Sequence, residues 1–131
     1  LTGEERYLSA ARRSADGLLG AQRADGALPG RLDKAWHPHV RWTCLTGNVQ
    51  AAACWLLLHA ATGDERYLSA ARRANAFVRR TIRLDGPEET RGGVKGSYPV
   101  TGDYGRFEYL NWAPKFAVDA FHLELDADAG A

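Results

Sequence analysis

The chain has 131 residues, of which 45% are hydrophobic and 25% are charged, a composition typical of one ordinary globular domain. The formal net charge of +1 argues against a protein that binds nucleic acid or a membrane surface through bulk charge. No apolar run reaches the length of about 18 residues that a membrane-spanning helix needs. Residues 1–15 also contain no apolar signal segment, so we expect a cytoplasmic protein.

One sequence motif occurs twice in the chain. Residues 2–13 read TGEERYLSAARR and residues 62–73 read TGDERYLSAARR, so that eleven of twelve positions match at an offset of 60. In both copies a threonine followed three residues later by a glutamate is typical of a helix start with a capping box. The predicted caps are Thr2 and Thr62, with Glu5 and Glu65 as their partners. Each copy therefore predicts an amphipathic helix that ends before an Asp-Gly turn, at 25–26 and at 85–86.

A second kind of helix alternates with the first. Residues 45–61 (LTGNVQAAACWLLLHAA) are apolar nearly all round, which predicts a helix that is buried on most sides and a buried free thiol at Cys54. Residues 111–125 match this segment at an offset of 63 and predict a second buried helix. If Asn111 caps that helix, Pro114 falls in the first turn, where proline is tolerated.

Two long loops connect these helices. Residues 24–43 and 84–110 are rich in glycine, proline, aspartate and aromatic residues, and loops of this length in compact domains are usually functional. Val94 and residues 98–100 predict a short β-hairpin inside a glycine-rich segment that spans residues 92–105. We therefore expect an all-α fold of αα-hairpins with one glycine-rich excursion.

The alternating helices resemble a known superfamily. Residues 62–68 (TGDERYL), which open the second amphipathic helix, look like the start of an outer helix in α/α-toroid proteins. This superfamily includes six-hairpin glycosidases, sugar epimerases, terpenoid cyclases and protein prenyltransferases. Residues 42–50, 92–99 and 104–116 are similar to bacterial toroid proteins of polysaccharide pathways. The resemblance implies a single partial toroid domain over residues 1–131, with hairpin repeats at about 2–61 and 62–125.

The resemblance also implies that the loops at the helix starts, residues 36–50 and 95–115, line a central cavity. Paired carboxylates can hydrolyse a glycosidic bond, and Asp103 and Glu108 are the best-placed pair on the loops. Tyr98 is a third catalytic candidate, with Tyr104 as the alternative, because the resemblance implies that tyrosine can act as an acid or base in toroid enzymes. A purely structural use of each is the alternative. The substrate-binding candidates are Trp42, Asn48, Gln50, Lys95, Tyr104, Asn111, Trp112 and Lys115.

Other chemistry has less support in the sequence. His37 and His39 form an HxH pair that could bind a metal, but such a pair needs a third ligand that no motif supplies. Lys115 stands four residues before Asp119, a spacing that also suits a simple ion pair on a helix. The two cysteines cannot form a disulfide framework. We expect neither a metal nor a cofactor.

Three functions remain open on the basis of the sequence. The first is a carbohydrate-active toroid enzyme, or a fragment of one, that acts on a poly- or oligosaccharide as a hydrolase, lyase or epimerase. The second is an isoprenoid- or terpenoid-handling toroid domain, and the third is a non-catalytic helical-repeat module that binds a partner. The expected ligand is a glycan or another small molecule. The apolar segments 45–61 and 111–125 would be covered by the rest of a longer chain or by a homo-oligomer.

Overall fold

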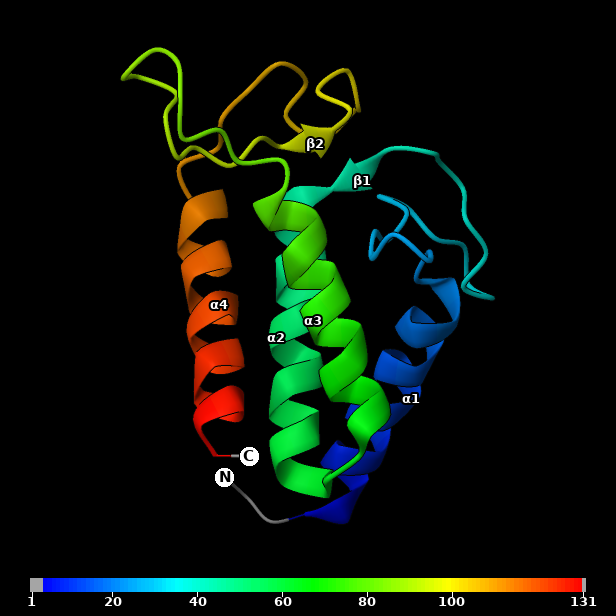
Figure 1. Cartoon of the computed structure of the whole chain (residues 1–131). Helices are drawn as coiled ribbons and strands as arrows, with labels where there is room; N and C mark the ends of the chain where they lie inside the picture. The colour runs from blue at the N-terminus through cyan, green and yellow to red at the C-terminus, as the bar shows by residue number, and fades with distance from the viewer. Residues whose placement is uncertain (1–3, 131) are drawn as a thin grey trace.

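The computed structural model describes residues 4–130, and these are mostly helical (Figure 1). The elements in chain order are α1 (Glu5–Ala21), β1 (Thr43–Cys44), α2 (Leu45–Thr62), α3 (Glu65–Arg79), β2 (Ser97–Tyr98) and α4 (Ala113–Ala129). Figure 1 shows the helices standing side by side, with the long loops gathered at one end, above the start of α2. The all-α class is therefore confirmed. Within residues 4–130, no helix is both long and apolar enough to cross a membrane.

Helix α2 forms the centre of the fold. It contacts each of the other three helices, most extensively α3 and α4. Trp55 is fully buried and its indole Nε1 donates a hydrogen bond to the carbonyl oxygen of Ala15 in α1, 3.2 Å away. The helix predicted over residues 45–61 is thus present and largely buried.

Helix α4 is less buried than its sequence predicts. Its buried side consists of Ala113, Ala117, Ala120 and Glu124. On another side, Val118 and Leu125 are 52% and 63% exposed. The expectation that this helix is buried nearly all round is wrong for the described chain, because α2 and α3 cover only one side of it.

The starts of the amphipathic helices also differ from the prediction. Thr62 does not cap α3, because it is the last residue of α2. Gly63, whose φ of 70° is left-handed, forms the C-terminal cap of α2. Asp64 caps α3 instead, by accepting a hydrogen bond from the backbone N–H of Arg66, and Glu65 is the first residue of the helix rather than a capping-box partner. At the start of α1, Glu4 occupies the cap position without a side-chain capping bond. The predicted cap Thr2 lies outside the described residues.

The glycine-rich segment pairs with a distant part of the chain. β2 does not form a hairpin with Val94. It pairs antiparallel with β1, so that Thr43 lies opposite Tyr98 and Cys44 opposite Ser97. The local hairpin prediction is therefore wrong, since the partner strand stands more than fifty residues earlier in the sequence.

Two further local predictions concern α4 and the thiol of α2. Trp112, not Asn111, occupies the cap position of α4, while Pro114 does lie in the first turn of the helix. Cys54 is exposed rather than buried. It lines the open hollow between α1 and α2, on a side of α2 that no other helix of residues 4–130 covers, so its apolar sequence neighbours do not make it buried.

The long loop after α1 is fixed to the helices by Asn48, whose side chain is fully buried. The amide oxygen of Asn48 accepts a hydrogen bond from the backbone N–H of Leu28 at 2.8 Å. Its amide nitrogen donates to the carbonyl oxygens of Ala74 in α3, at 2.9 Å, and of Gly26, at 3.4 Å. Gly26 has a φ of 93°, and a Cβ there would lie 2.1 Å from the Arg73 carbonyl oxygen, so only glycine fits. One buried amide thus joins α2, α3 and the loop.

We expect Asn48→Ala to lower the free energy of unfolding by about 2–3 kcal/mol, because it leaves buried backbone groups without partners. Gln50→Ala is the matched control: this amide stands two residues away on the same helix but is exposed, so the change should stay within about 0.5 kcal/mol. Urea denaturation measures both. Equal stability of the two variants would contradict the anchoring role of Asn48.

The two thiols should react at different rates. Burial raises the pKa of the Cys44 thiol, and its sulfur accepts a hydrogen bond from the backbone N–H of Gly47. Because the thiolate is the nucleophile, Cys44 needs a higher pH than an ordinary cysteine to react. In dilute protein near neutral pH, we expect a thiol reagent to modify Cys54 well before Cys44. Comparing Cys44→Ser with Cys54→Ser assigns the fast phase, and a fast phase that survives in Cys54→Ser would contradict this order.

Candidate functional site

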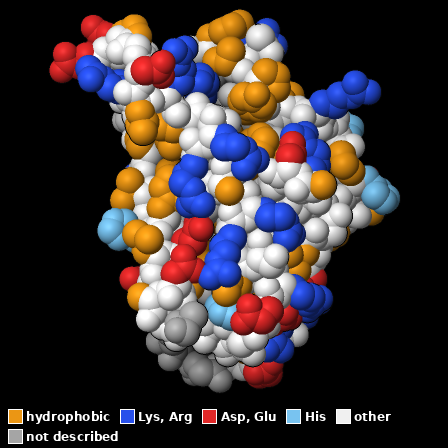
Figure 2. All heavy atoms as spheres, viewed as in Figure 1, with side chains coloured by type: hydrophobic (Ala, Val, Ile, Leu, Met, Phe, Trp, Pro, Cys, Tyr) orange, Lys and Arg blue, Asp and Glu red, His pale blue; other side chains and the backbone are white. Residues whose placement is uncertain are grey.

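The two long loops meet at one end of the helices. The β1–β2 pair joins them, and the backbone N–H of Leu45 at the start of α2 donates to the carbonyl oxygen of Gly96 at 3.1 Å. Figure 1 shows both loops at this end, and Figure 2 shows hydrophobic side chains gathered there. We define the loop-end surface as six exposed or half-buried side chains at this end. Its members are Arg31, Trp42, Tyr98, Asp103, Tyr104 and Trp112.

One part of the loop-end surface is built around Trp42. Its backbone carbonyl accepts a hydrogen bond from the N–H of Gly30 at 2.7 Å, and a Cβ on Gly30 would lie 2.1 Å from the indole ring. The guanidinium of Arg31 lies 5.6 Å from the centre of that ring and pairs with the Asp103 carboxylate at 2.9 Å. A charged pair therefore lies beside a half-buried aromatic ring.

A second part of the loop-end surface is held by Ser97. Its buried hydroxyl donates to the carbonyl oxygen of Tyr104 at 2.7 Å and accepts from the backbone N–H of the same residue at 3.1 Å. The indole Nε1 of Trp112 donates to the Tyr104 hydroxyl at 3.3 Å. Two exposed aromatic rings are thus tied to each other and to strand β2.

Tyr98 and Lys95 occupy the space between the sheet and the end of α3. Tyr98 is 47% exposed, and its ring meets that of Phe77 edge to face, with centroids 5.6 Å apart. The ammonium of Lys95 donates to the carbonyl oxygen of Thr81 at 3.2 Å and lies 5.7 Å from the centre of the Tyr109 ring. Lys95 therefore already has partners within the chain.

The structure does not bring all the predicted site residues together. Asn48 is buried beneath the loop and fixes it, while Gln50 is exposed on α2. Lys115 pairs with Asp119 on α4, as the alternative interpretation of their spacing predicts. Glu108 and Asn111 are exposed on the second loop, and the backbone carbonyl of Glu108 accepts from the N–H of Gly96.

Two residues of this end of the molecule were not assigned a catalytic or binding role from the sequence. Arg31 is paired with a carboxylate 72 residues later in the chain, and no local pattern announces a partner at that distance. Ser97 precedes Tyr98 in the glycine-rich segment, but its role depends on the return of the chain at Tyr104. A motif search cannot find either residue, because each acts through a contact that only the folded loops create.

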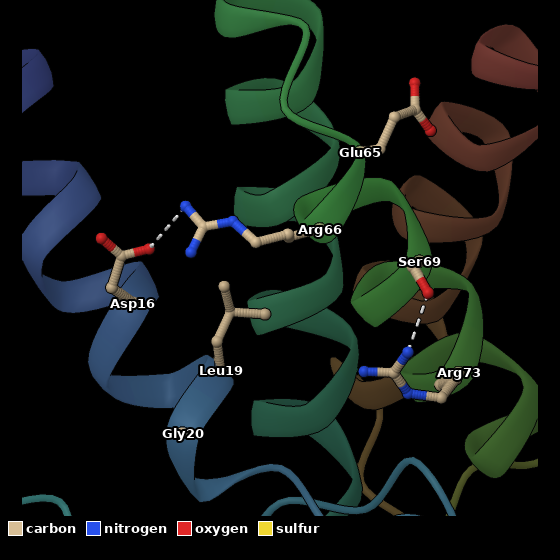
Figure 3. A pocket seen from close by; sticks show the side chains of 7 residues that line it. All are labelled: Asp16, Leu19, Gly20, Glu65, Arg66, Ser69 and Arg73. Carbon is tan, nitrogen blue, oxygen red and sulfur yellow. Dashed lines mark hydrogen bonds and ion pairs between the residues drawn. The ribbon is translucent and has the colours of Figure 1, made fainter.

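Two hollows in the described chain lie between helices rather than at the loop end. One, of about 630 Å³, lies between α1 and α3 (Figure 3). Its Arg66 pairs with Asp64 and Asp16, and its Arg73 donates to Ser69 and Gln22, so its cations already have partners. The other, of about 740 Å³, lies between α1 and α2 and is lined mostly by apolar side chains, together with Glu4, Glu5 and Ser14. Neither hollow is lined by residues of the loop-end surface.

The histidine pair of the first loop belongs to a turn. The ring Nδ1 of His37 lies 3.3 Å from the Asp33 carboxylate, and the backbone N–H of His39 donates to the carbonyl oxygen of Arg31. Backbone hydrogen bonds from His37 and Ala35 lower the pKa of Asp33. Across residues 4–130, no three histidine, cysteine, aspartate or glutamate side chains come together as a metal site would require.

Comparisons with known proteins identify no relative of this chain. No family model, no curated protein and no solved structure matches the chain. The toroid resemblance and the functions that it implies therefore stay hypotheses.

Proposed function

We propose that the loop-end surface binds carbohydrate. The observation that carries the proposal is the set of exposed aromatic rings held by a hydrogen-bonded frame: Tyr98 is 47% exposed, Tyr104 36% and Trp112 48%. Large aromatic side chains left in contact with water cost free energy, and contiguous patches of them mark interaction sites. Their position on loops mounted on a helical scaffold is typical of binding residues.

The chemistry of the surface suits a sugar better than a purely apolar ligand. Tyrosine and tryptophan combine an apolar ring face, which can pack on the C–H face of a sugar, with a polar edge. Beside Trp42, the pair of Arg31 and Asp103 supplies both donors and acceptors for hydroxyl groups. Because Ser97 and Gly30 already fix the backbone around these rings, little order has to be gained on binding.

The geometry favours binding over turnover. The Asp103 carboxylate is paired with Arg31, and neither of the two hollows between the helices is lined by Asp103 or Glu108. Catalytic carboxylates in glycosidases face each other across an enclosed bond. We therefore propose a carbohydrate-binding module of αα-hairpins, with Asp103 as a ligand contact.

We expect Tyr98→Ala and Arg31→Ala each to weaken oligosaccharide binding by about tenfold or more, because each removes a central contact. Leu84→Ala is the control, since Leu84 is 79% exposed on the second loop but is not part of the loop-end surface. A glycan array identifies a ligand and isothermal titration calorimetry measures its affinity. Wild-type protein that binds no glycan, or variants that bind as tightly as wild type, would contradict the proposal.

The second test separates binding from catalysis. We expect wild-type protein to leave bound oligosaccharides intact, and Asp103→Asn to weaken their binding while Glu108→Gln has little effect. Incubation with an oligosaccharide panel, followed by chromatography of the products, detects turnover. If wild type does convert a substrate and both variants lose about 10²-fold or more of that activity, the two carboxylates form a catalytic pair and the binding-only form is wrong.

A further inference from the structure

The two copies of the repeated motif have nearly the same sequence but different surroundings. In α3, Tyr67 is 2% exposed and Leu68 is 5% exposed, and both Ala70 and Ala71 are fully buried. The corresponding residues of α1, at an offset of 60, include Tyr7, which is 54% exposed, and Ala10 and Ala11, which are exposed. The repeated helix face is thus buried in α3 and mostly exposed in α1.

The second pair of helices shows the same difference. On α4, the residues that face the neighbouring helices are Ala113, Ala117, Ala120 and Glu124. At the offset of 63 they correspond to Gln50, Cys54, Leu57 and Ala61 of α2, and all four of these are exposed. The side by which α4 packs into the fold therefore has a counterpart on α2 that stays exposed in the described chain.

The two uncovered faces lie next to each other. α2 packs against both α3 and α4. One repeat earlier, α1 and α2 correspond to α3 and α4. The apolar hollow of about 740 Å³ lies between α1 and α2. Its lining includes Tyr7, Leu8, Ala11, Cys54 and Leu57. Because α2 packs against α3 and α4, the corresponding groove between α1 and α2 should accept a helix like α2, with one side that is apolar along its length.

The described chain offers one such helix with a free side. Val118 corresponds to Trp55 of α2 at the offset of 63, but it is 52% exposed where Trp55 is fully buried. Val118, His122 and Leu125 follow at helical spacing and form one line along α4. This line lies away from the side of α4 that packs on α2 and α3.

We propose that the groove between α1 and α2 binds α4 of a second copy of this chain. One contact covers both uncovered surfaces: the groove of one copy and the outer side of α4 of the next. Such an interface is head-to-tail, because two different surfaces meet, and each dimer keeps one free groove and one free α4. The inference rests on the unequal burial of repeated faces and does not depend on carbohydrate binding.

Two charged variants test the interface. Ala11→Glu places a carboxylate in the groove, and Val118→Glu places one on α4; both positions are exposed, so each chain should keep its fold. Sedimentation velocity over a concentration series should show wild type associating beyond a dimer. Each variant alone should associate at least about tenfold more weakly than wild type. An equimolar mixture of the two variants should form a dimer and associate no further. Each mixed pair has only one intact groove and one intact α4, and these two bind each other.

Leu84→Glu is the control, since it charges an even more exposed apolar position outside both surfaces, and it should associate like wild type. Circular dichroism verifies that each variant is folded. Wild-type protein that stays monomeric throughout the series would overturn the proposal. A mixture of the two variants that stays monomeric would overturn it as well, since it would show that the two surfaces do not bind each other.

Discussion

The burial of α2 is the packing constraint on which the rest of the structure depends. Among its eighteen residues are no Asp, Glu, Lys or Arg, so the helix has no polar face to turn towards water. α3 and α4 cover most of it, and Trp55 connects it to α1. At its start, Asn48 and the β1–β2 pair fix the loops that carry the exposed aromatic rings. The loop-end surface and the uncovered groove both follow from how this one helix is surrounded.

Local signals in the sequence predict the helices well and their surroundings poorly. The apolar run over residues 45–61 and the position of Pro114 predict two helices that the structure contains. The same apolar character wrongly predicts that Cys54 is buried. Hydrophobicity shows that a side chain favours burial, but it does not show that another helix is present to cover it. Helix starts are also ambiguous, because Asp64 competes with Thr62 for the same cap.

The candidate site could be predicted only in part for a related reason. Aromatic and charged residues in long glycine-rich loops indicate that function lies there, and the loops do meet. Which side chains become partners depends on contacts between distant segments, such as Arg31 with Asp103 and Ser97 with Tyr104. Asn48 has the residue type of a ligand contact, yet its buried amide is used to hold the loop in place.

If the groove between α1 and α2 binds a helix of another copy, Cys54 reports on this binding directly, because Cys54 lines the groove. The decisive measurement is the rate at which a thiol reagent modifies Cys54 in Cys44→Ser protein, where serine can still cap α2. The rate should fall as the protein concentration rises, and it should stay constant in protein that also carries Val118→Glu. A rate that is independent of concentration in both proteins would contradict the claim.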